Sequence, residues 1–334
     1  MTTLTIRPYA GEADLEAIAH LINACEAVDR TDSGTSVSEL RQSFDDPSVD
    51  KARNIYLWKD AENQIIGIGR LWIPPADTVI DGFLGFRVHP TARGKDLEKQ
   101  IIAWGEGRMR EIQQERGVLM KLRSRSRADQ SEHVALLESS GFRADRYFFT
   151  MERSLSLPIS EPQLPEGFVV REMQGEQDIQ AWVEMYNQAF IDHWNHHELT
   201  VERMRHEWKN PYYKPELDLI ATATDDTFAA FCHCHINPED NKRNGRHEGW
   251  IICLGTRRGF RHRGLGRAML LAGMQRLQTA GVEIAKLGVD VENPTGALRL
   301  YESVGFQKAY TNISYVKDVS NTELLSNVEF NVDA

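Results

Sequence analysis

The chain has 334 residues, a hydrophobic fraction of 41% and a charged fraction of 26%, so we expect a globular protein of two domains. Its formal net charge of -10 argues against a nucleic-acid partner, because phosphate backbones are bound by clustered lysine and arginine. Without a signal-peptide pattern, a membrane-length apolar run or a cysteine framework (the chain has 4 cysteines), it is expected to be cytoplasmic and to have no membrane partner.

The two halves of the chain begin and end alike. "IRPYAGEADLEAIAHLIN" (6–23) and "VREMQGEQDIQAWVEMYN" (170–187) both read as a strand followed by an amphipathic helix. "LLESSGF" (136–142) and "LYESVGF" (300–306) match at the same offset of 164, since 170 − 6 = 300 − 136. Between the halves lies a proline-rich linker, "SLSLPISEPQLPEG" (154–167). The pattern indicates duplication of a whole domain.

The second half gives the clearer succession of elements. An alternating hairpin is predicted over 219–236, turning at the pair of aspartates, and an apolar strand over 248–256. A helix over 265–281 ends at a glycine, and an alternating strand follows over 284–292. A last helix is predicted to open at Asn293-Pro294 and to end at Gly305. This order predicts an α+β class, each domain a mixed, mostly antiparallel sheet flanked by helices.

The segment "RHRGLGRAML" (261–270) places three arginines and two glycines at the start of the helix over 265–281. A helix start exposes unpaired N–H groups and the positive end of the helix dipole. Glycines let a phosphate approach the backbone, and arginines add charged hydrogen bonds. The pattern therefore favours a pyrophosphate site, although a basic capping loop without a ligand has the same composition.

Arg261-x-x-Gly264-x-Gly266 resembles the acetyl-CoA pyrophosphate motif of the GNAT superfamily of acyl-CoA N-acyltransferases. "NPTGALRLYESVGF" (293–306) resembles the closing segment of the same family, and the tandem arrangement is similar to that of mycothiol synthases. The resemblance implies an enzyme that moves the acetyl group of acetyl-CoA to a primary amine of a small molecule by direct attack. A Rossmann nucleotide site is excluded by the glycine spacing and by the lack of a preceding parallel βαβ unit.

The resemblance also implies a set of cofactor contacts. Backbone groups of three consecutive strand residues would meet the pantetheine arm, the basic loop would wrap the pyrophosphate, and an asparagine would touch the cofactor beyond the fifth strand. In this sequence these residues are Leu254, Gly255 and Thr256, then Arg261, His262, Arg263, Gly264, Leu265, Gly266 and Arg267, and finally Asn293. No metal is expected.

Direct attack needs a donor for the departing thiolate and an acceptor for the amine proton. The resemblance assigns the donor to Tyr301, which also belongs to an apolar stripe with Leu300 and Val304 and so has a core residue as its alternative. The acceptor is assigned to Glu248, at the entrance of the strand over 248–256. A solvated strand-end carboxylate, with a water chain as the acceptor, is its alternative.

The first half has lost this loop. Its counterpart is "RGKDLE" (93–98), where Asp96 and Glu98 replace the glycines and repel a pyrophosphate, and Leu137 replaces the tyrosine. We therefore expect four parts in the chain. They are a degenerate, non-catalytic domain (1–153), a linker (154–167), a catalytic domain (168–318) and an acidic tail (319–334).

Two histidine-rich segments remain. In "CHCH" (232–235) strand alternation places the cysteines on one face and the histidines on the other, and the pair spacing is not that of a zinc site. "DHWNHHEL" (192–199) follows the first helix of the second half, so His193, Trp194 and His196 are candidates for the substrate pocket, and its histidines are candidates for an alternative proton acceptor. An exposed polar loop is the other interpretation of this segment.

Two further functions share these motifs. One is a non-catalytic acyl-CoA-binding sensor or scaffold protein, and the other is a protein or peptide N-acetyltransferase, which needs an open groove. The intact loop and Tyr301 argue against the first. The expected partner is a small-molecule amine, and the protein is expected to be a monomer or homodimer.

Overall fold

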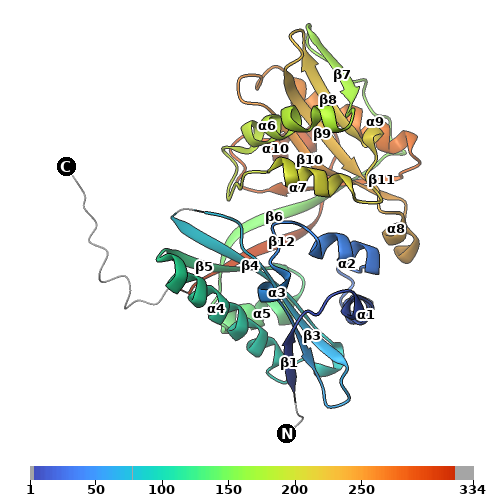
Figure 1. Cartoon of the computed structure of the whole chain (residues 1–334). Coiled ribbons are helices and arrows are strands. Elements are labelled where there is room, and N and C mark those ends of the chain that lie inside the picture. Colours follow the sequence, from blue (N-terminus) through green and yellow to red (C-terminus); the bar gives the residue numbers. More distant parts are fainter. Residues whose placement is uncertain (1–3, 77, 320–334) are drawn as a thin grey trace, which may run out of the picture. The chain divides into compact units, whose positions relative to one another are not determined.

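A computed structural model describes residues 4–76 and 78–319, which form two units. Of the described residues, unit 1 comprises 4–76, 78–145 and 313–319, and unit 2 comprises Arg146–Asn312. In Figure 1 the last coloured segment of the chain, shown in red, therefore belongs to unit 1. The predicted acidic tail lies outside the described residues, apart from its first residue.

Unit 1 is a sheet with helices on both faces (Figure 1). Its strands are β1 (Thr5–Pro8), β2 (Ile55–Lys59), β3 (Ile65–Trp72), β4 (Val79–Val88) and β5 (Leu119–Arg127), with the second part of β12 (Gln307–Asp318) beside β5. β1 with β2, β2 with β3, and β3 with β4 pair antiparallel, whereas β4 and β5 are parallel. The helices are α1 (Glu12–Asp29), α2 (Val37–Phe44), α3 (Lys51–Asn54), α4 (Leu97–Arg116) and α5 (Ser131–Ser139), with the short turn η1 (Pro90–Ala92).

Unit 2 repeats this plan. In spatial order its strands are β6 (Arg143–Ser154), β11 (Ile284–Asp290), β10 (Glu248–Thr256), β9 (Phe228–His235), β8 (Asp218–Ala223) and β7 (Phe168–Glu172). Only β10 and β11 are parallel. The helices are α6 (Ile179–Phe190), α7 (Val201–Trp208), α8 (Pro238–Asn244), α9 (Leu265–Thr279) and α10 (Ala297–Ser303), with the short turns η2 (Glu176–Asp178) and η3 (Pro215–Leu217). One face of the sheet is covered by α9 and α10, the other by α6 and α7.

The unit boundaries differ from the expected domain boundaries, because each unit takes its last strand from the other half of the sequence. β6 pairs with β11 from Ser154 to Phe148, so residues 146–153 complete the sheet of unit 2. Residues 313–318 of β12 belong to unit 1. Ile313 and Tyr315 there join the hydrophobic cluster under α4, which includes Ile101 and Met109. The predicted linker is bound to unit 2, since Leu155 is buried and its N–H donates to Glu283 O at 2.7 Å.

The repeated residues at the start of each half form the same contacts twice. Arg7 makes a bidentate ion pair with Asp14 at 2.8 and 2.5 Å, and Arg171 makes one with Asp178 at 2.6 and 2.9 Å. Each aspartate also accepts a backbone N–H at 2.8 Å. The sequence repeat thus preserves contacts that fix the first helix of each unit against its edge strand.

The helix ends of unit 2 agree with the sequence at one place and differ at another. α9 ends beside Gly281, whose φ of +83° allows Val282 N–H to bond Leu277 O at 3.1 Å, as predicted. α10 begins at Ala297 and not at Asn293. Gly296, with φ +76°, holds a left-handed conformation that interrupts a helix, so the helix starts only after it.

Candidate active site

The sheet of unit 2 opens between β10 and β11. The two strands pair from Glu248 to Ile251 only, and beyond a bulge at Ile252 the described part of β10 pairs with β9 alone. The extra residue of a bulge bends its strand away from its partner. Leu254, Gly255 and Thr256 therefore present one edge of their backbone to the opening, as an extended chain paired there would require.

The glycine loop follows β10 and leads into α9. His262 (φ +62°) and Gly264 (φ +87°) are left-handed, and Gly264 is the N-cap of the helix. No described residue accepts a hydrogen bond from the N–H groups of residues 262–267, and the first bond of the turn is Ala268 N–H to Gly264 O at 3.1 Å. Such a run of unpaired N–H groups at a positive helix end binds anions.

The arginines of the loop divide into two groups. Arg261 donates to Asp192 at 2.7 Å and to Ala189 O at 2.9 Å, so its side chain fastens the loop to the end of α6. Arg263 and Arg267 bond only neutral groups of the described chain, Gly259 O at 3.3 Å and Ser303 Oγ at 2.7 Å. These two cations remain uncompensated beside the N–H groups.

Tyr301 satisfies both of its sequence interpretations. It lies on α10 with 8% of its surface exposed. Its ring packs against Phe306 in the hydrophobic cluster under α9 that includes Leu265 and Met269, called here the α9 core. Its hydroxyl makes no hydrogen bond with the described residues, and its oxygen is not fully buried. Burial raises its pKa, with further contributions from the thiols of Cys232 and Cys253, so the hydroxyl stays protonated at neutral pH.

Glu248 lies at the first residue of β10, on the side of the bulge away from the opening. Its carboxylate contacts the buried Lys286 at 2.7 Å and Arg246 at 3.5 Å. Cys253 lies five residues further along the strand, roughly 16 Å away at ~3.3 Å per residue. Its carboxylate is thus held by two cations, away from the open edge.

The remaining candidates make mostly local contacts. Asn293 accepts from Thr295 N–H at 2.9 Å, forming a turn just after β11. After α6, His193 bonds Trp194 O at 2.9 Å, and burial lowers the pKa of His196. The ring of Trp194 packs on Phe148 and under Arg146, which also holds the buried Asp290 at 2.9 Å.

The buried carboxylate of Asp218 on β8, which is 0% exposed, belongs to no motif of the sequence. Trp182 Nε1 donates to it at 3.2 Å and Tyr213 OH at 3.1 Å. Burial raises its pKa, partly opposed by His233, whose ring packs against Tyr213 at 5.8 Å between centroids. A lone aspartate before an apolar strand was the only signal in the sequence.

The "CHCH" strand alternates as predicted. Cys232 and Cys234 are buried in the α9 core with their sulfurs 3.7 Å apart, and Gly273 of α9 leaves them room. His233 lies on the opposite face, the one that α6 and α7 cover. The two histidines of the segment therefore face the helices beside the opening and not the α9 core.

Unit 1 shares the parting of the parallel strands, since β4 and β5 pair only as far as Phe83 and Arg123, but it differs in three other features. Its β3 and β4 pair without a bulge, and Ser124 Oγ bridges to Leu84 O at 3.0 Å just past the last parallel pair. Asp96 takes the left-handed N-cap position of α4. Glu98 accepts from Gly94 N–H at 3.2 Å, so a carboxylate of the chain itself occupies the anion position.

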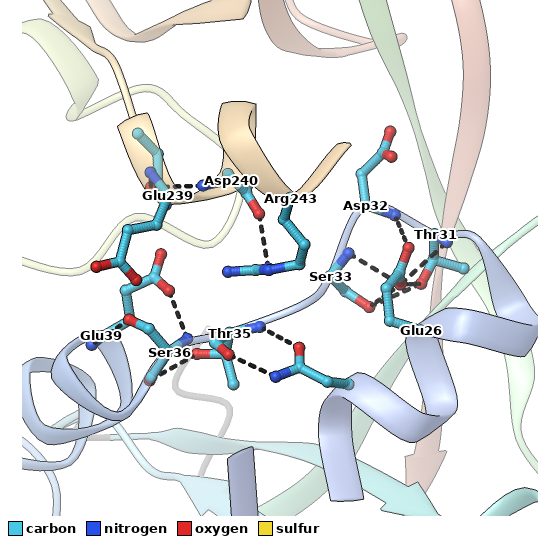
Figure 2. A network of polar contacts seen from close by, with 12 residues as sticks. Glu26, Thr31, Asp32, Ser33, Thr35, Ser36, Glu39, Glu239, Asp240 and Arg243 are labelled. Atoms are coloured by element: carbon cyan, nitrogen blue, oxygen red, sulfur yellow. Dashed lines mark hydrogen bonds and ion pairs between the residues drawn. The ribbon is translucent and has the colours of Figure 1, made fainter. Parts of the chain in front are cut away.

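The loop after α1 in unit 1 is also filled from within. Figure 2 shows Glu26 surrounded by Thr31, Asp32 and Ser33. Its carboxylate accepts the N–H groups of all three residues at 2.9–3.1 Å and two hydroxyls as well. These hydrogen bonds lower the pKa of Glu26 despite its partial burial.

No helix among the described residues is long and apolar enough to cross a membrane. Residues 179–306 match the model of the acetyltransferase (GNAT) family. The chain is 30% identical to a mycothiol acetyltransferase of Kineococcus radiotolerans over 295 residues, 86% of this chain and 89% of that protein. It is 28% identical to a mycothiol acetyltransferase of Thermobispora bispora over 233 residues, 68% of this chain and 73% of that protein.

Two solved structures share the fold over nearly the whole chain. A GCN5-related N-acetyltransferase from Sphaerobacter thermophilus has a TM-score of 0.72 and 25% identity, covering 95% of this chain and 96% of that one. A tandem GNAT protein from the clavulanic acid biosynthesis pathway has the same TM-score at 13% identity, covering 96% and 99%. The predicted α+β fold of two GNAT-like domains is thereby confirmed.

Proposed function

The chain belongs to the GNAT family of acetyltransferases and is an acyl-CoA-dependent N-acetyltransferase, and from this premise we propose that unit 2 carries the activity. We propose that it moves the acetyl group of acetyl-CoA to a primary amine of a small molecule. The observation that carries the proposal is the run of unpaired N–H groups at the start of α9, next to an open sheet. Unit 1 is proposed to be a non-catalytic scaffold.

In this proposal the side chains and backbone of unit 2 divide the work. The N–H groups of residues 262–267, with Arg263 and Arg267, hold the pyrophosphate, while the side chain of Arg261 positions the loop. Leu254, Gly255 and Thr256 pair with the pantetheine arm along the free edge of β10, and Asn293 borders it. Tyr301 donates its hydroxyl proton to the departing sulfur.

The nature of the acceptor is supported by the relatives and by the loop after α6. Both relatives named above are mycothiol acetyltransferases, which favours an amine carried by a small polar molecule. His193, Trp194 and His196 lie on the loop proposed to border the acceptor. An aromatic ring beside polar groups suits a polar organic amine better than an extended peptide.

The test is an acceptor screen with acetyl-CoA and the intact protein. The panel holds amino sugars, aminoacylated thiols of the mycothiol type, amine antibiotics and peptides with free amino groups. We expect CoA release and an N-acetylated product, identified by mass spectrometry, with small-molecule amines. Normal acetyl-CoA binding without any product would favour an acyl-CoA sensor, and products on peptides alone would favour a peptide acetyltransferase.

A further inference from the structure

We propose that His233 is the group that accepts the amine proton, and that Asp218 and Tyr213 position its ring. The proposal rests on the proposed function of unit 2 and assigns the proton acceptor to a residue other than Glu248. It follows from the register of three strands, the packing around the ring and the location of Tyr301 on the opposite face.

The strand register places His233 at the opening. β8 and β9 pair Asp218 with His233, and β9 and β10 pair His233 with Cys253. Cys253 is the first residue beyond the bulge, where β10 parts from β11. Since neighbouring strands are ~4.8 Å apart, the backbone of His233 is one strand spacing from the open edge. Glu248 is five residues away along β10.

His233 and Tyr301 reach the opening from opposite faces of the sheet. His233 alternates with Cys232 and Cys234, which belong to the α9 core, so it lies on the face that α6 and α7 cover. Tyr301 belongs to the α9 core, and its hydroxyl lies within electrostatic range of Cys253. A thioester lying in the opening would thus have a proton donor on one face and an acceptor on the other.

The surroundings of His233 suit this task. Its ring makes no hydrogen bond with the described residues, and its nitrogens are not fully buried. A ring nitrogen is therefore open to a ligand. Asp218 is fully buried on the neighbouring strand, opposite His233, and the two groups interact electrostatically. Trp208 of α7 packs beside Tyr213, with 5.7 Å between ring centroids, and so helps to fix the ring that contacts His233.

The step balances without any further reagent. The amine nitrogen forms a bond to the acetyl carbon as its proton passes to the imidazole of His233, and the carbon–sulfur bond breaks as Tyr301 gives its proton to the sulfur. The imidazolium then returns its proton to solvent, and the tyrosine is reprotonated.

The groups that face this site limit how a pH profile is read. Asp218 on β8, Tyr213 before η3 and Cys253 on β10 surround the ring. Tyr186 of α6 and Glu207 of α7 interact electrostatically with Cys253. Burial raises the pKa of the Cys253 thiol to about 12, so this group stays neutral between pH 5 and 9.

The first test uses the acceptor found by the screen and the full chain. We expect His233→Gln to lower kcat/KM about 100-fold at pH 7, within the range of general-base catalysis, and to remove the acidic limb of the profile. Imidazole added to His233→Ala is expected to restore activity. Tyr213→Phe is expected to lower kcat with little change in KM. The control His235→Gln, two residues along the same strand, should retain activity.

Three results would overturn the proposal: full activity in His233→Gln, no rescue by imidazole, or loss of the acidic limb in Glu248→Gln with His233 intact. A second measurement needs no acceptor. We expect acetyl-CoA to shift the imidazole NMR signals of His233 in the wild type but not in Gly264→Glu. Unshifted signals in a wild type that binds acetyl-CoA would contradict the placement of His233. Absence of product from the wild type would instead count against the proposed function.

Discussion

The start of α4 in unit 1 and the start of α9 in unit 2 have the same backbone plan, but they differ in whether their N–H groups are paired. Both follow a clamped arginine, since Arg93 holds Asp29 at 2.6 Å as Arg261 holds Asp192 at 2.7 Å. Both N-caps are left-handed, at Asp96 and Gly264. In unit 1 Glu98 takes the N–H of Gly94, whereas in unit 2 the corresponding groups are free.

This difference separates residues that build the fold from residues that bind. The arginine clamp persists in the unit whose glycines are lost, which assigns Arg261 to holding the loop. The bulge at Ile252, 52% exposed, has no counterpart at Leu84, 2% exposed. Gly288, where an added Cβ would meet nothing, corresponds to Ser124, whose hydroxyl closes the sheet. The two units therefore differ in a few local features, and the proposed binding of acetyl-CoA depends on them.

The largest effect is expected from removing the hydroxyl of Tyr301, whose counterpart in unit 1 is Leu137. Tyr301→Phe should lower kcat by about 10²- to 10⁴-fold, because the thiolate would leave without a proton donor. Acetyl-CoA affinity should be unchanged, since the ring still fills its place in the core. Steady-state kinetics and calorimetry measure the two quantities, with Tyr9→Phe in unit 1 as the control. A kcat within a factor of a few of the wild type would leave Tyr301 a core residue only.

An intermediate effect is expected from replacing the two loop arginines that bond only neutral groups. Arg263→Gln combined with Arg267→Gln should weaken acetyl-CoA binding about 10- to 100-fold and reduce its salt dependence, because two phosphate partners are lost. Arg261→Lys should instead lower the thermal midpoint of unit 2, as Arg93→Lys lowers that of unit 1. Equal losses of affinity in Arg261→Lys and the double variant would show that the clamp arginine also contacts the pyrophosphate.

The smallest effect concerns acid stability. His133 stands in unit 1 where unit 2 has Ala297, and burial, followed by the charge of Arg87, lowers its pKa to about 4. The unfolded state therefore binds a proton more readily between about pH 6.5 and 4, and unit 1 loses stability as the pH falls through this window. At pH 5 the loss is about 2 kcal/mol, at ~1.4 kcal/mol per pH unit.

Thermal unfolding at pH 7 and pH 5 checks this linkage. His133→Gln should lose less stability on acidification than the wild type, while the exposed His20→Gln should behave like the wild type. An identical pH dependence in all three proteins would mean that His133 titrates alike in the folded and unfolded chain.

The sequence predicted the duplicated α+β plan, the hairpin, α9 and the family, because these depend on local pattern and on motifs. It did not predict the exchange of β6 and β12 between units, since the pairing of strands far apart in the chain leaves no local signal. The role of Arg261 was hidden for a similar reason, because its partner Asp192 lies 69 residues earlier.

The candidate site was predicted unevenly. The loop and Tyr301 carry a motif, whereas Glu248 was assigned from the family resemblance and its place at the strand entrance. Its contact with Lys286 depends on the register of β10 with β11. The sequence did show His233 and His235 on one strand face. The placement of His233 beside the opening depends on the bulge at Ile252. This backbone feature has no signal in the side chains of the sequence.

The central claim is that one loop of the chain holds acetyl-CoA, and a calorimetric titration of the intact protein tests it most directly. The account predicts one site per chain, abolished in Gly264→Glu, because a side chain at φ +87° is strained and its carboxylate repels the pyrophosphate. Asp96→Gly in unit 1 should leave the stoichiometry unchanged. Two sites in the wild type, or normal binding by Gly264→Glu, would contradict the account.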